Sequence, residues 1–552
     1  MLRTEARLRE PRGNRTTASR PGLIELVAAI VFVAWSVRFI SRASFLAIDG
    51  HRYWGLFDDA LISMRYAWNL AHGLGLVWNP GERVEGYSNP LTTLIMAVAS
   101  AVLDRRGAVL AVQLLGIPTV LAAAYLTSRL ATRFDRVPPA AASSVRGLAF
   151  CAALLFYPLS YWSLSGMETG LLALLFVAGL LAVETWAEDG RDRHLVGCGA
   201  SLGFMCVARP DGILLALLVG LAFAHAAIRR DPHTAPRKIA ALLGIALVLP
   251  AAQVLFRGVF YGALLPNTYV LKLSGFPLEA RLRGGLGFVR PFLPVVSIVL
   301  APIALGLARG PSRPKVVAAA ALLLLLAYQI AVGGDPWPYW RILTPAVPLA
   351  VALAGHEIWS LAARALRAGE GKAMGGSVRS AIAIAIAAMA VLFFALNKDF
   401  LKEMTFDRRP YQWEANAANV NTALALQQVM KPTASVGVYW AGAIPYYTSL
   451  RAVDFLGKSD PVIARLAPDL TGAIAWSGMS SVPGHNKYDL DYSIATLQPT
   501  YVQGFRWGRR DLSSWGRAHY DSVGYRGVGL WLRRGAMEVR WDLVPADPGG
   551  GA

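Results

Sequence analysis

Long apolar runs are the feature that most limits how this chain can fold. Runs long enough to cross the ~30 Å hydrocarbon core of a bilayer recur from Leu23 to Leu396 and then stop. The chain has 552 residues, of which 55% are hydrophobic and 16% charged, and this is far more apolar than an ordinary globular enzyme. The sequence therefore predicts a polytopic α-helical membrane protein over residues 23–396, followed by a soluble domain over residues 397–552.

The net charge of +19 does not indicate a nucleic-acid-binding protein. Outside the C-terminal part, most Lys and Arg residues lie in short stretches between apolar runs, where such residues orient helices in the bilayer. The cysteines, Cys151, Cys198 and Cys206, fall in predicted helices without metal-ligand or redox spacing. They are typical of small packing residues, and the C-terminal domain has no cysteine with which to form a disulfide.

The N-terminal segment is rich in arginine before the first apolar run begins at Leu23. No convincing small-residue cleavage site follows this run, so it is interpreted as an uncleaved first helix rather than a signal peptide. The basic residues 1–22 are then expected in the cytoplasm.

The run from Pro90 to Leu103 decides the topology, because it is only about fourteen residues long and too short to span. If it did span, the loop with Arg129, Arg133 and Arg146 would lie outside, against the bias of short basic loops toward the cytoplasm. As a juxtamembrane helix it leaves that loop and all later basic loops inside. The chain then has about eleven spans, predicted at 23–40, 107–128, 147–162, 170–187, 195–208, 212–228, 239–256, 286–308, 316–332, 342–363 and 381–396.

This topology places the segments with unusual polar residues on one side of the membrane. They are 41–106, 165–169, 208–212, 257–283, 333–341 and the C-terminal domain. Charges at membrane depth are costly and usually functional, so their convergence indicates a single site at the outer face. The sequence therefore predicts a multi-pass protein of the cytoplasmic (inner) membrane, with its site and its C-terminal domain extracytoplasmic.

Two adjacent carboxylates, Asp58 and Asp59, begin an amphipathic stretch in the first outer loop. Helical spacing puts Asp58 and Arg65 on one face, which aims a carboxylate and a guanidinium into one cleft. Either aspartate is equally suited to cap the helix that follows. The alternative is catalysis, since neighbouring carboxylates raise the pKa of one of them, which suits a general base.

The remaining outer charges each have a structural and a functional interpretation. Lys272 is placed either to reach lipid headgroups or to bind a lipid phosphate. Arg209 and Asp211 flank Pro210, which is also typical of a turn with a local ion pair. A membrane-boundary belt explains the aromatic residues of 333–341 but not the pairing of Asp335 with Arg341.

Several motifs, in order along the chain, resemble those of one enzyme superfamily. Phe57-Asp58-Asp59-Ala60-Leu61-Ile62-Ser63-Met64-Arg65-Tyr66, followed by Gly75 to Asn89, resembles the first-loop signature of GT-C glycosyltransferases, most closely the mycobacterial terminal (β-1,2) arabinofuranosyltransferase group. The resemblance continues through 165–169, 209–212, 265–269 and 333–341, and through 440–447, 454–457 and 484–487 in the C-terminal domain. It departs at 91–93, which lack an expected tryptophan, and relatives with a flagellar-motor role share parts of the pattern.

The resemblance implies a GT-C fold and an enzyme that moves a sugar, here arabinofuranose as one candidate, from a polyprenyl phosphate to an acceptor hydroxyl of a cell-envelope glycan. The first acidic residue of the first outer loop is then catalytic, which carries over to Asp58, with Asp59 as its neighbour. Substrate contacts are expected, from the motifs and the charges above, at Arg65, Tyr66, Asn79, Glu85, Tyr87, Asn89, Glu168, Arg209, Asp211, Asn267, Tyr269, Lys272, Asp335, Arg341, His485 and Lys487.

The expected chemistry follows from where a lipid phosphate arrives. Arg65, Lys272 and Arg341 would stabilise the negative charge that the phosphate gains as its bond to the sugar breaks, and Asp58 would take the acceptor's proton. His485 and Lys487 would contact the acceptor glycan from above. Because no nucleotide diphosphate leaves, neither a metal nor another cofactor is expected to be obligatory.

The C-terminal domain is predicted to be α/β. Strands are expected at 434–440, 451–456, 500–505 and 527–532, with helices at about 412–430 and 460–466. Two other functions remain open: a transporter of lipid-linked sugars, and a non-catalytic scaffold or motor-control protein with the same motifs. Transport is disfavoured because the polar residues gather at one face rather than at mid-membrane.

Overall fold

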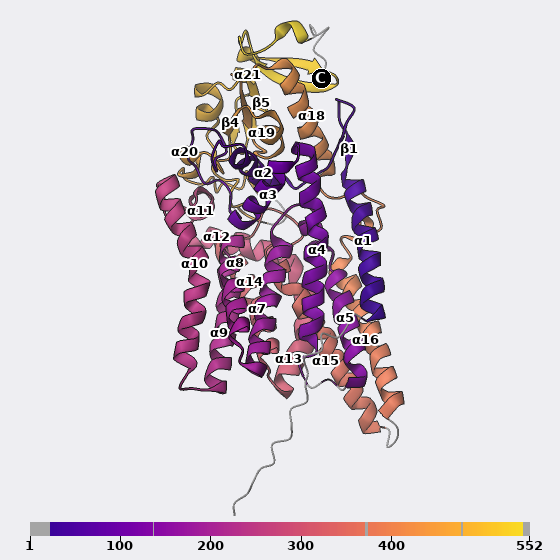
Figure 1. Cartoon of the computed structure of the whole chain (residues 1–552). Helices are drawn as coiled ribbons and strands as arrows, with labels where there is room; N and C mark the ends of the chain where they lie inside the picture. Colours follow the sequence, from indigo (N-terminus) through magenta and orange to yellow (C-terminus); the bar gives the residue numbers. More distant parts are fainter. Residues whose placement is uncertain (1–21, 136, 138, 370–373, 476–478, 545–552) are drawn as a thin grey trace, which may run out of the picture.

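The computed structural model describes residues 22–135, 137, 139–369, 374–475 and 479–544 (Figure 1). A bundle of long helices forms one end of the molecule, and a smaller α/β part stands on the other end (Figure 1). The basic N-terminal segment expected in the cytoplasm lies, except for Gly22, outside the described residues.

The bundle contains the long apolar helices and two shorter ones, α6 and α12, that precede or follow them directly in the chain. They are α1 (Leu23–Ala43), α4 (Arg105–Ala131), α5 (Pro139–Leu154), α6 (Tyr157–Leu164), α7 (Thr169–Asp189), α8 (Asp192–Ala208), α9 (Gly212–Arg230), α10 (Ala235–Tyr261), α12 (Leu278–Val289), α13 (Leu293–Arg309), α14 (Arg313–Val332), α15 (Val347–Gly369) and α16 (Met374–Asn397). Each expected span overlies one of these helices, or a pair that is consecutive in the chain. Among the described residues, 8 helices are long and apolar enough to span a membrane, or up to 9 if the bent pair α5–α6 is one span.

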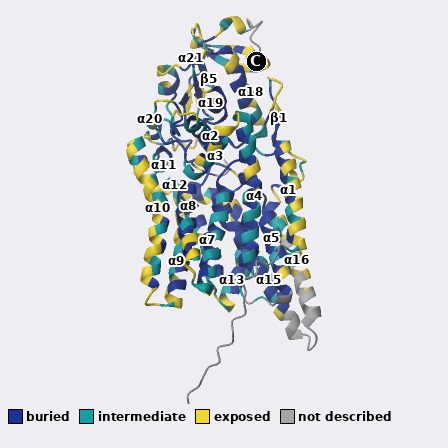
Figure 2. Cartoon of the chain, viewed as in Figure 1, coloured by how far each residue is buried: buried dark blue, intermediate teal, exposed yellow. Residues whose placement is uncertain are grey.

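The outer faces of the bundle suit a lipid environment. Only 11% of the most apolar part of α10 is buried inside the molecule, whereas the most apolar part of the span that contains α15 is 83% buried (Figure 2). Leu247, Leu255 and Val259 of α10 are among the exposed apolar side chains. In water this surface would be strongly unfavourable, and in a bilayer it costs nothing. The chain is therefore a multi-pass membrane protein, as the sequence predicts.

One predicted span is broken. The sequence indicates a single helix over 147–162, but α5 and α6 meet at an angle of 56°. Pro158 lies in the first turn of α6. A proline has no N–H to donate to the carbonyl four residues earlier, and its ring clashes with that carbonyl, so α5 cannot continue through this position. The bend lies just ahead of this proline, at Leu155 and Phe156.

Short elements lie between the bundle and the α/β part. They are β1 (Phe45–Leu46), β2 (Arg52–Tyr53), α2 (Asp58–Ala71), α3 (Pro90–Val102) and α11 (Asn267–Leu273) (Figure 1). The 13-residue α3 is the expected juxtamembrane helix. It packs on α2 and on α4, so it holds the first outer loop against the end of the bundle.

The C-terminal part is α/β, as predicted. Its sheet has the order β4-β3-β5-β9-β8, with β3 parallel to β4 and β5 and the other pairs antiparallel. The strands are β3 (Ser435–Val438), β4 (Arg451–Asp454), β5 (Tyr501–Val502), β8 (Tyr520–Tyr525) and β9 (Val528–Arg533), with a hairpin of β6 (Arg506–Trp507) and β7 (Arg510–Asp511). The helices are α17 (Leu401–Met404), α18 (Trp413–Val429), α19 (Ala443–Thr448), α20 (Pro461–Ala464) and α21 (Ser513–His519).

Strand β8 is the strand of the five-stranded sheet that sequence patterning missed. Only Tyr520 and Val523 of its residues are buried, so its apolar periodicity is weak.

A shared core joins the first outer loop to the C-terminal sheet. Ile62 and Tyr66 of α2 and Trp78 of the loop are buried in one cluster with Val436 and Ile444 of the C-terminal part. The loop and the sheet therefore form one packed unit above the bundle, and the side chains of both converge there.

Candidate active site

Two neighbouring cavities lie at the junction of the bundle and the C-terminal part. The larger has a volume of about 300 Å³ and the smaller about 40 Å³, and Ser88, Thr268 and Lys272 line both. Of the residues expected from the sequence, the larger cavity brings together Arg209, Asp211, Tyr269, Lys272 and Asp335. The smaller brings together Asp59, Tyr87, Asn89, Lys272 and Arg341.

Asp59 is the carboxylate that faces the smaller cavity. Its Oδ2 accepts from Arg341 at 2.9 Å and from Trp337 Nε1 at 3.2 Å, and its Oδ1 lies 3.3 Å from Lys458 Nζ. Burial alone would raise the pKa of this carboxyl, but the positive charges of Lys458 and Arg341 hold the pKa well below its usual range. Asp59 is therefore a fixed negative charge and a poor proton acceptor.

Asp58 does not line either cavity, contrary to the placement expected from helical spacing. Its two carboxylate oxygens accept from the backbone amides of Gly442 at 3.2 Å and Ala443 at 3.0 Å, where α19 begins. The alternative that Asp58 caps its own helix is also wrong, because it lies in the first turn of α2, which has no side-chain cap. Burial raises the pKa of Asp58 to about 6, so environment gives the two neighbouring carboxylates opposite acidities.

Most cations of the site are already neutralised by a partner. Arg341 makes two contacts of 2.9 Å with Asp335, and Arg209 pairs with Glu168 and with Asp211. Such paired charges are stable in a buried setting because each compensates the other.

Lys272 is different. Among the described residues, its ammonium has neither a hydrogen bond nor an ion pair, although it lies where the two cavities meet. Burial lowers the pKa of Lys272 to about 8. An unpaired cation in a partly enclosed cavity is a strong binding site for an anion.

Arg65 does not contribute to the cavities, which corrects its expected role as a phosphate ligand. Its guanidinium is 1% exposed and donates to the carbonyls of Trp78 at 2.7 Å, Leu450 at 2.9 Å and Pro445. With its donors used by backbone oxygens, Arg65 ties α2 to the loops around α19.

Replacing Arg65 with methionine is therefore expected to destabilise the protein rather than to weaken substrate binding. The change removes the donor to the buried carbonyl of Leu450, at about 1–3 kcal/mol for an unsatisfied group. The carbonyls of Trp78 and Pro445 each lose one of two donors, since Asn69 and the Ser449 amide still donate to them. The measurement is the thermal unfolding midpoint in detergent or nanodiscs, together with the KM for the donor. A raised KM for the donor with an unchanged unfolding midpoint would contradict this structural role.

Other expected ligands are also held by the protein itself. Asn79 exchanges hydrogen bonds of 2.8 and 3.0 Å with the backbone of Ala452, and Lys487 donates to the carbonyls of Val270 and Ala464. His485 is 1% exposed among tryptophan rings, and burial lowers its pKa to about 3. The expectation that His485 and Lys487 reach up to an acceptor is therefore wrong. The expected residues that line neither cavity are Asp58, Arg65, Tyr66, Asn79, Glu85, Glu168, Asn267, His485 and Lys487.

Two cations of the site were missed by sequence reasoning. Arg257 lines the larger cavity and pairs with Glu85 at 3.1 Å. The sequence did contain a signal for Arg257, because an arginine near the end of a long apolar run is a charge at membrane depth, and such charges are usually functional. Lys458 lines the smaller cavity from the turn after β4. No local pattern marks Lys458, because only the packing of the C-terminal part brings it to Asp59.

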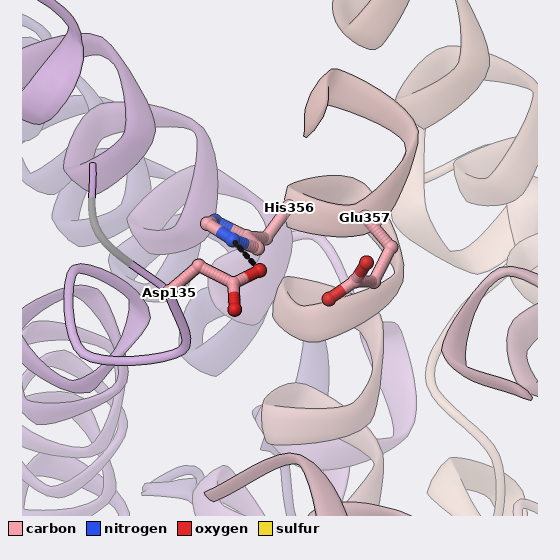
Figure 3. A group of neighbouring side chains, drawn as sticks. All are labelled: Asp135, His356 and Glu357. Atoms are coloured by element: carbon pink, nitrogen blue, oxygen red, sulfur yellow. Dashed lines mark hydrogen bonds and ion pairs between the residues drawn. The ribbon is translucent and has the colours of Figure 1, made fainter. Parts of the chain in front are cut away.

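Figure 3 shows a separate group of possible metal ligands, which come from the α4–α5 loop and from α15. Asp135, His356 and Glu357 offer ligand atoms within 4.8 Å of one another. However, the ammonium of Lys315 contacts Asp135 at 2.8 Å and Glu357 at 2.7 Å, and Arg309 also pairs with Glu357. The lysine thus occupies the position that a cation would need, and the cluster is an ionic link between α13, α14, α15 and the α4–α5 loop.

Comparison with known proteins gives matches in both parts of the chain. Residues 406–539 match the model of a family described as a domain of unknown function (DUF8728). The chain is 28% identical over 246 residues to the terminal β-(1→2)-arabinofuranosyltransferase of Corynebacterium glutamicum. This aligned region covers 40% of this chain and 33% of that protein. It is 28% identical over 278 residues to the Mycobacterium tuberculosis protein of the same name, covering 48% and 42%. The chain thus matches less than half the length of these relatives.

Two solved structures share the architecture. One is ArnT from Cupriavidus metallidurans in the apo state, with a TM-score of 0.50, 14% identity, and coverage of 78% of this chain and 86% of that one. The other is the oligosaccharyltransferase AglB from Archaeoglobus fulgidus in complex with an inhibitory peptide and a dolichol-phosphate, with a TM-score of 0.50, 13% identity, and coverage of 94% and 75%. At these identities the likeness shows the fold alone, and it confirms the GT-C fold that the motifs predict.

Proposed function

We propose that the protein is a membrane glycosyltransferase that moves a sugar from a polyprenyl-phosphate donor to a hydroxyl of a cell-envelope glycan. The observation that carries this proposal is the ammonium of Lys272, which has no partner among the described residues and lies where the two cavities meet. Asp59 lines the smaller of these cavities, and its neighbour Asp58 has the opposite acidity. The curated relatives, named as arabinofuranosyltransferases, make arabinofuranose the first donor sugar to test.

The proposed location of the reaction is the extracytoplasmic face of the cytoplasmic (inner) membrane. Residues 23–396 then form the catalytic membrane unit, residues 397–552 an extracytoplasmic domain, and residues 1–22 a cytoplasmic segment. Basic loops support this orientation: Arg229 and Arg230 end α9, and Arg309 ends α13, at the end of the bundle away from the cavities.

The donor's phosphate is proposed to bind at Lys272. The larger cavity reaches Cys206, Gln253 and Tyr328 of the bundle helices, so a headgroup there stays attached to a lipid chain in the bilayer. The sugar then extends toward Asp59 in the smaller cavity. The solved AglB complex contains a dolichol-phosphate, which is a lipid phosphate of the same chemical class.

The proposed step forms one bond and breaks one. The acceptor oxygen bonds to the anomeric carbon as the bond from that carbon to the phosphate oxygen breaks, and the polyprenyl phosphate leaves with the electron pair. The phosphate gains negative charge, so the fixed cation Lys272 stabilises the transition state more than the ground state. No nucleotide diphosphate leaves, so the proposal needs no divalent metal.

Asp58 and Asp59 are proposed to have different roles in this step. Asp59 is held ionised and stabilises positive charge that develops on the sugar ring. Asp58 accepts the acceptor's proton, because a carboxyl with a pKa of about 6 is nearly ionised at neutral pH and is still basic enough to take a proton. The acceptor hydroxyl must approach Asp58 beside Gly442 and Ala443.

The test uses the purified full-length protein in nanodiscs. Labelled polyprenyl-phosphate sugars, with arabinofuranose first, are supplied with an envelope glycan acceptor, and the product is examined for a new glycosidic bond. Transfer that depends on the protein supports the proposal. Absence of transfer with every donor would indicate a non-catalytic scaffold. Sugar that crosses a vesicle membrane without a new glycosidic bond would indicate a transporter.

A further inference from the structure

Lys458 reaches the site from a part of the chain far from the membrane helices. It follows β4 in the C-terminal part, is 6% exposed, and lines the smaller cavity. Its ammonium lies 3.3 Å from Asp59 Oδ1, while Arg341 contacts the other oxygen of the same carboxylate at 2.9 Å. The C-terminal part thus supplies one of the two cations that hold Asp59.

The turn that carries Lys458 is fixed from within the C-terminal part. The carboxylate of Asp454 accepts from the amides of Leu456 at 3.0 Å and Ser459 at 2.7 Å. Gly457 has a φ of +76°, and a Cβ there would lie 2.7 Å from Ile463, so this position requires glycine. The backbone of the turn is therefore held by contacts within the C-terminal part.

The membrane unit holds the same turn from the other side. The side-chain amide of Asn267, at the start of α11, donates to the carbonyls of Gly457 at 2.9 Å and Lys458 at 3.0 Å. A Cβ on Gly86 of the first outer loop would lie 2.8 Å from the Lys458 carbonyl. Asn267 and Gly86 thus both contact this turn, one by hydrogen bonds and the other by close approach of its backbone.

Three carboxylates act on the Lys458 ammonium. Burial lowers its pKa, but Asp59, then Asp454 and Asp58, raise it above the ordinary value, so the side chain stays charged. Lys458 in turn acts on Asp58: among the neighbouring charges, Lys458 lowers the pKa of Asp58 most strongly, and Asp59 raises the pKa of Asp58. Besides these charges, Asp58 faces the backbone amides of Gly442 and Ala443.

We infer that Lys458 is a positioning residue by which the C-terminal part completes the site, holding Asp59 against Arg341 and balancing the charge of the Asp58–Asp59 pair. The membrane helices by themselves then carry an incomplete site. This inference rests on the proposed function for its kinetic consequences, while its electrostatic consequence is independent of any substrate.

The kinetic test compares Lys458→Gln with Lys458→Arg in the full chain. Lys458→Gln is expected to lower kcat by about 10²-fold, as a misplaced reacting group does, and to move the acidic limb of the pH profile up by about 1 unit or more. Lys458→Arg is expected to restore the limb and most of the rate. Lys487→Gln is the matched control: it removes another buried lysine of the same part and should lower thermal stability without moving the limb.

A second measurement needs no donor. Infrared difference spectra between the wild type and Asp58→Asn isolate the titration of the Asp58 carboxyl, expected near pH 6 in the wild type and at higher pH in Lys458→Gln. The inference would be overturned if the Asp58 titration were unshifted in Lys458→Gln and if Lys458→Arg transferred sugar no faster than Lys458→Gln. If wild-type protein transfers no sugar but the titration shifts as expected, the proposed function fails and the charge balance by Lys458 stands.

Discussion

Asp58→Asn is expected to lower the transfer rate by about 10²- to 10⁴-fold, the range for loss of a general base. The amide cannot accept the acceptor's proton. It also presents an N–H group to one of the two backbone amides, Gly442 or Ala443, that donate to Asp58. The thermal unfolding midpoint is therefore measured beside the rate, to separate lost chemistry from a loosened contact with α19. A variant with an undiminished rate would exclude Asp58 as the base.

The pH dependence of the wild type gives an independent check on the same residue. Because the pKa of Asp58 is raised to about 6, the basic form prevails above that pH and is lost as the pH falls through it. We expect kcat/KM to be level between about pH 6 and about pH 8 and to fall tenfold for each unit below pH 6. Asp58→Asn should abolish this limb.

The comparison of Asp59→Asn with Asp58→Asn tests which of the two carboxylates is the base. Asp59→Asn removes the like charge that raises the pKa of its neighbour, so the acidic limb of its residual activity should move to lower pH. Its rate should also fall, because the buried Arg341 and Lys458 lose the carboxylate partner that they share. A limb that disappears in Asp59→Asn and persists in Asp58→Asn would reverse the two assignments.

Lys272→Met is expected to lower kcat/KM for the lipid-phosphate donor by about 10²- to 10³-fold, as removal of one transition-state charge partner does. No other cation of the cavities is free to replace it within the described part of the chain, because Arg209, Arg257, Arg341 and Lys458 are each paired with a carboxylate. The matched control is Lys402→Met, which removes an exposed lysine that lines neither cavity and should leave the kinetics unchanged.

Lys272 also predicts an alkaline limit on donor binding. Burial lowers its pKa to about 8, so the empty site loses this charge as the pH rises through that value. The KM for the donor is therefore expected to rise above about pH 8 in the wild type and to be flat there in Lys272→Met. An alkaline rise that is the same in both proteins would show that another group binds the phosphate.

Local pattern was sufficient for much of the architecture. The apolar runs located the helices of the bundle, the short run after Pro90 located α3, and β-branched and aromatic residues located β3, β4, β5 and β9. These features depend on the properties of consecutive residues, which hydrophobic periodicity and length record directly. The break before α6 is an exception that Pro158 explains.

The roles of individual charges were harder to assign from the sequence. Arg65 and Lys272 look alike there, since each is a cation in a polar outer segment. In the structure, backbone carbonyls take up the donors of Arg65, while Lys272 faces a cavity without a partner among the described residues. The difference lies in what surrounds each side chain, and those groups come from distant parts of the chain.

The sequence by itself determined that this is a membrane protein with a soluble C-terminal α/β part, and that its unusual charges, including the Asp58–Asp59 pair, gather at one end. Only the tertiary structure decided which carboxylate faces the cavity, which one the neighbouring cations keep ionised, and that Lys458 contacts Asp59. The physical reason is that burial and ion pairing depend on contacts between residues hundreds of positions apart, such as Asp58 with Gly442, and no local pattern encodes them.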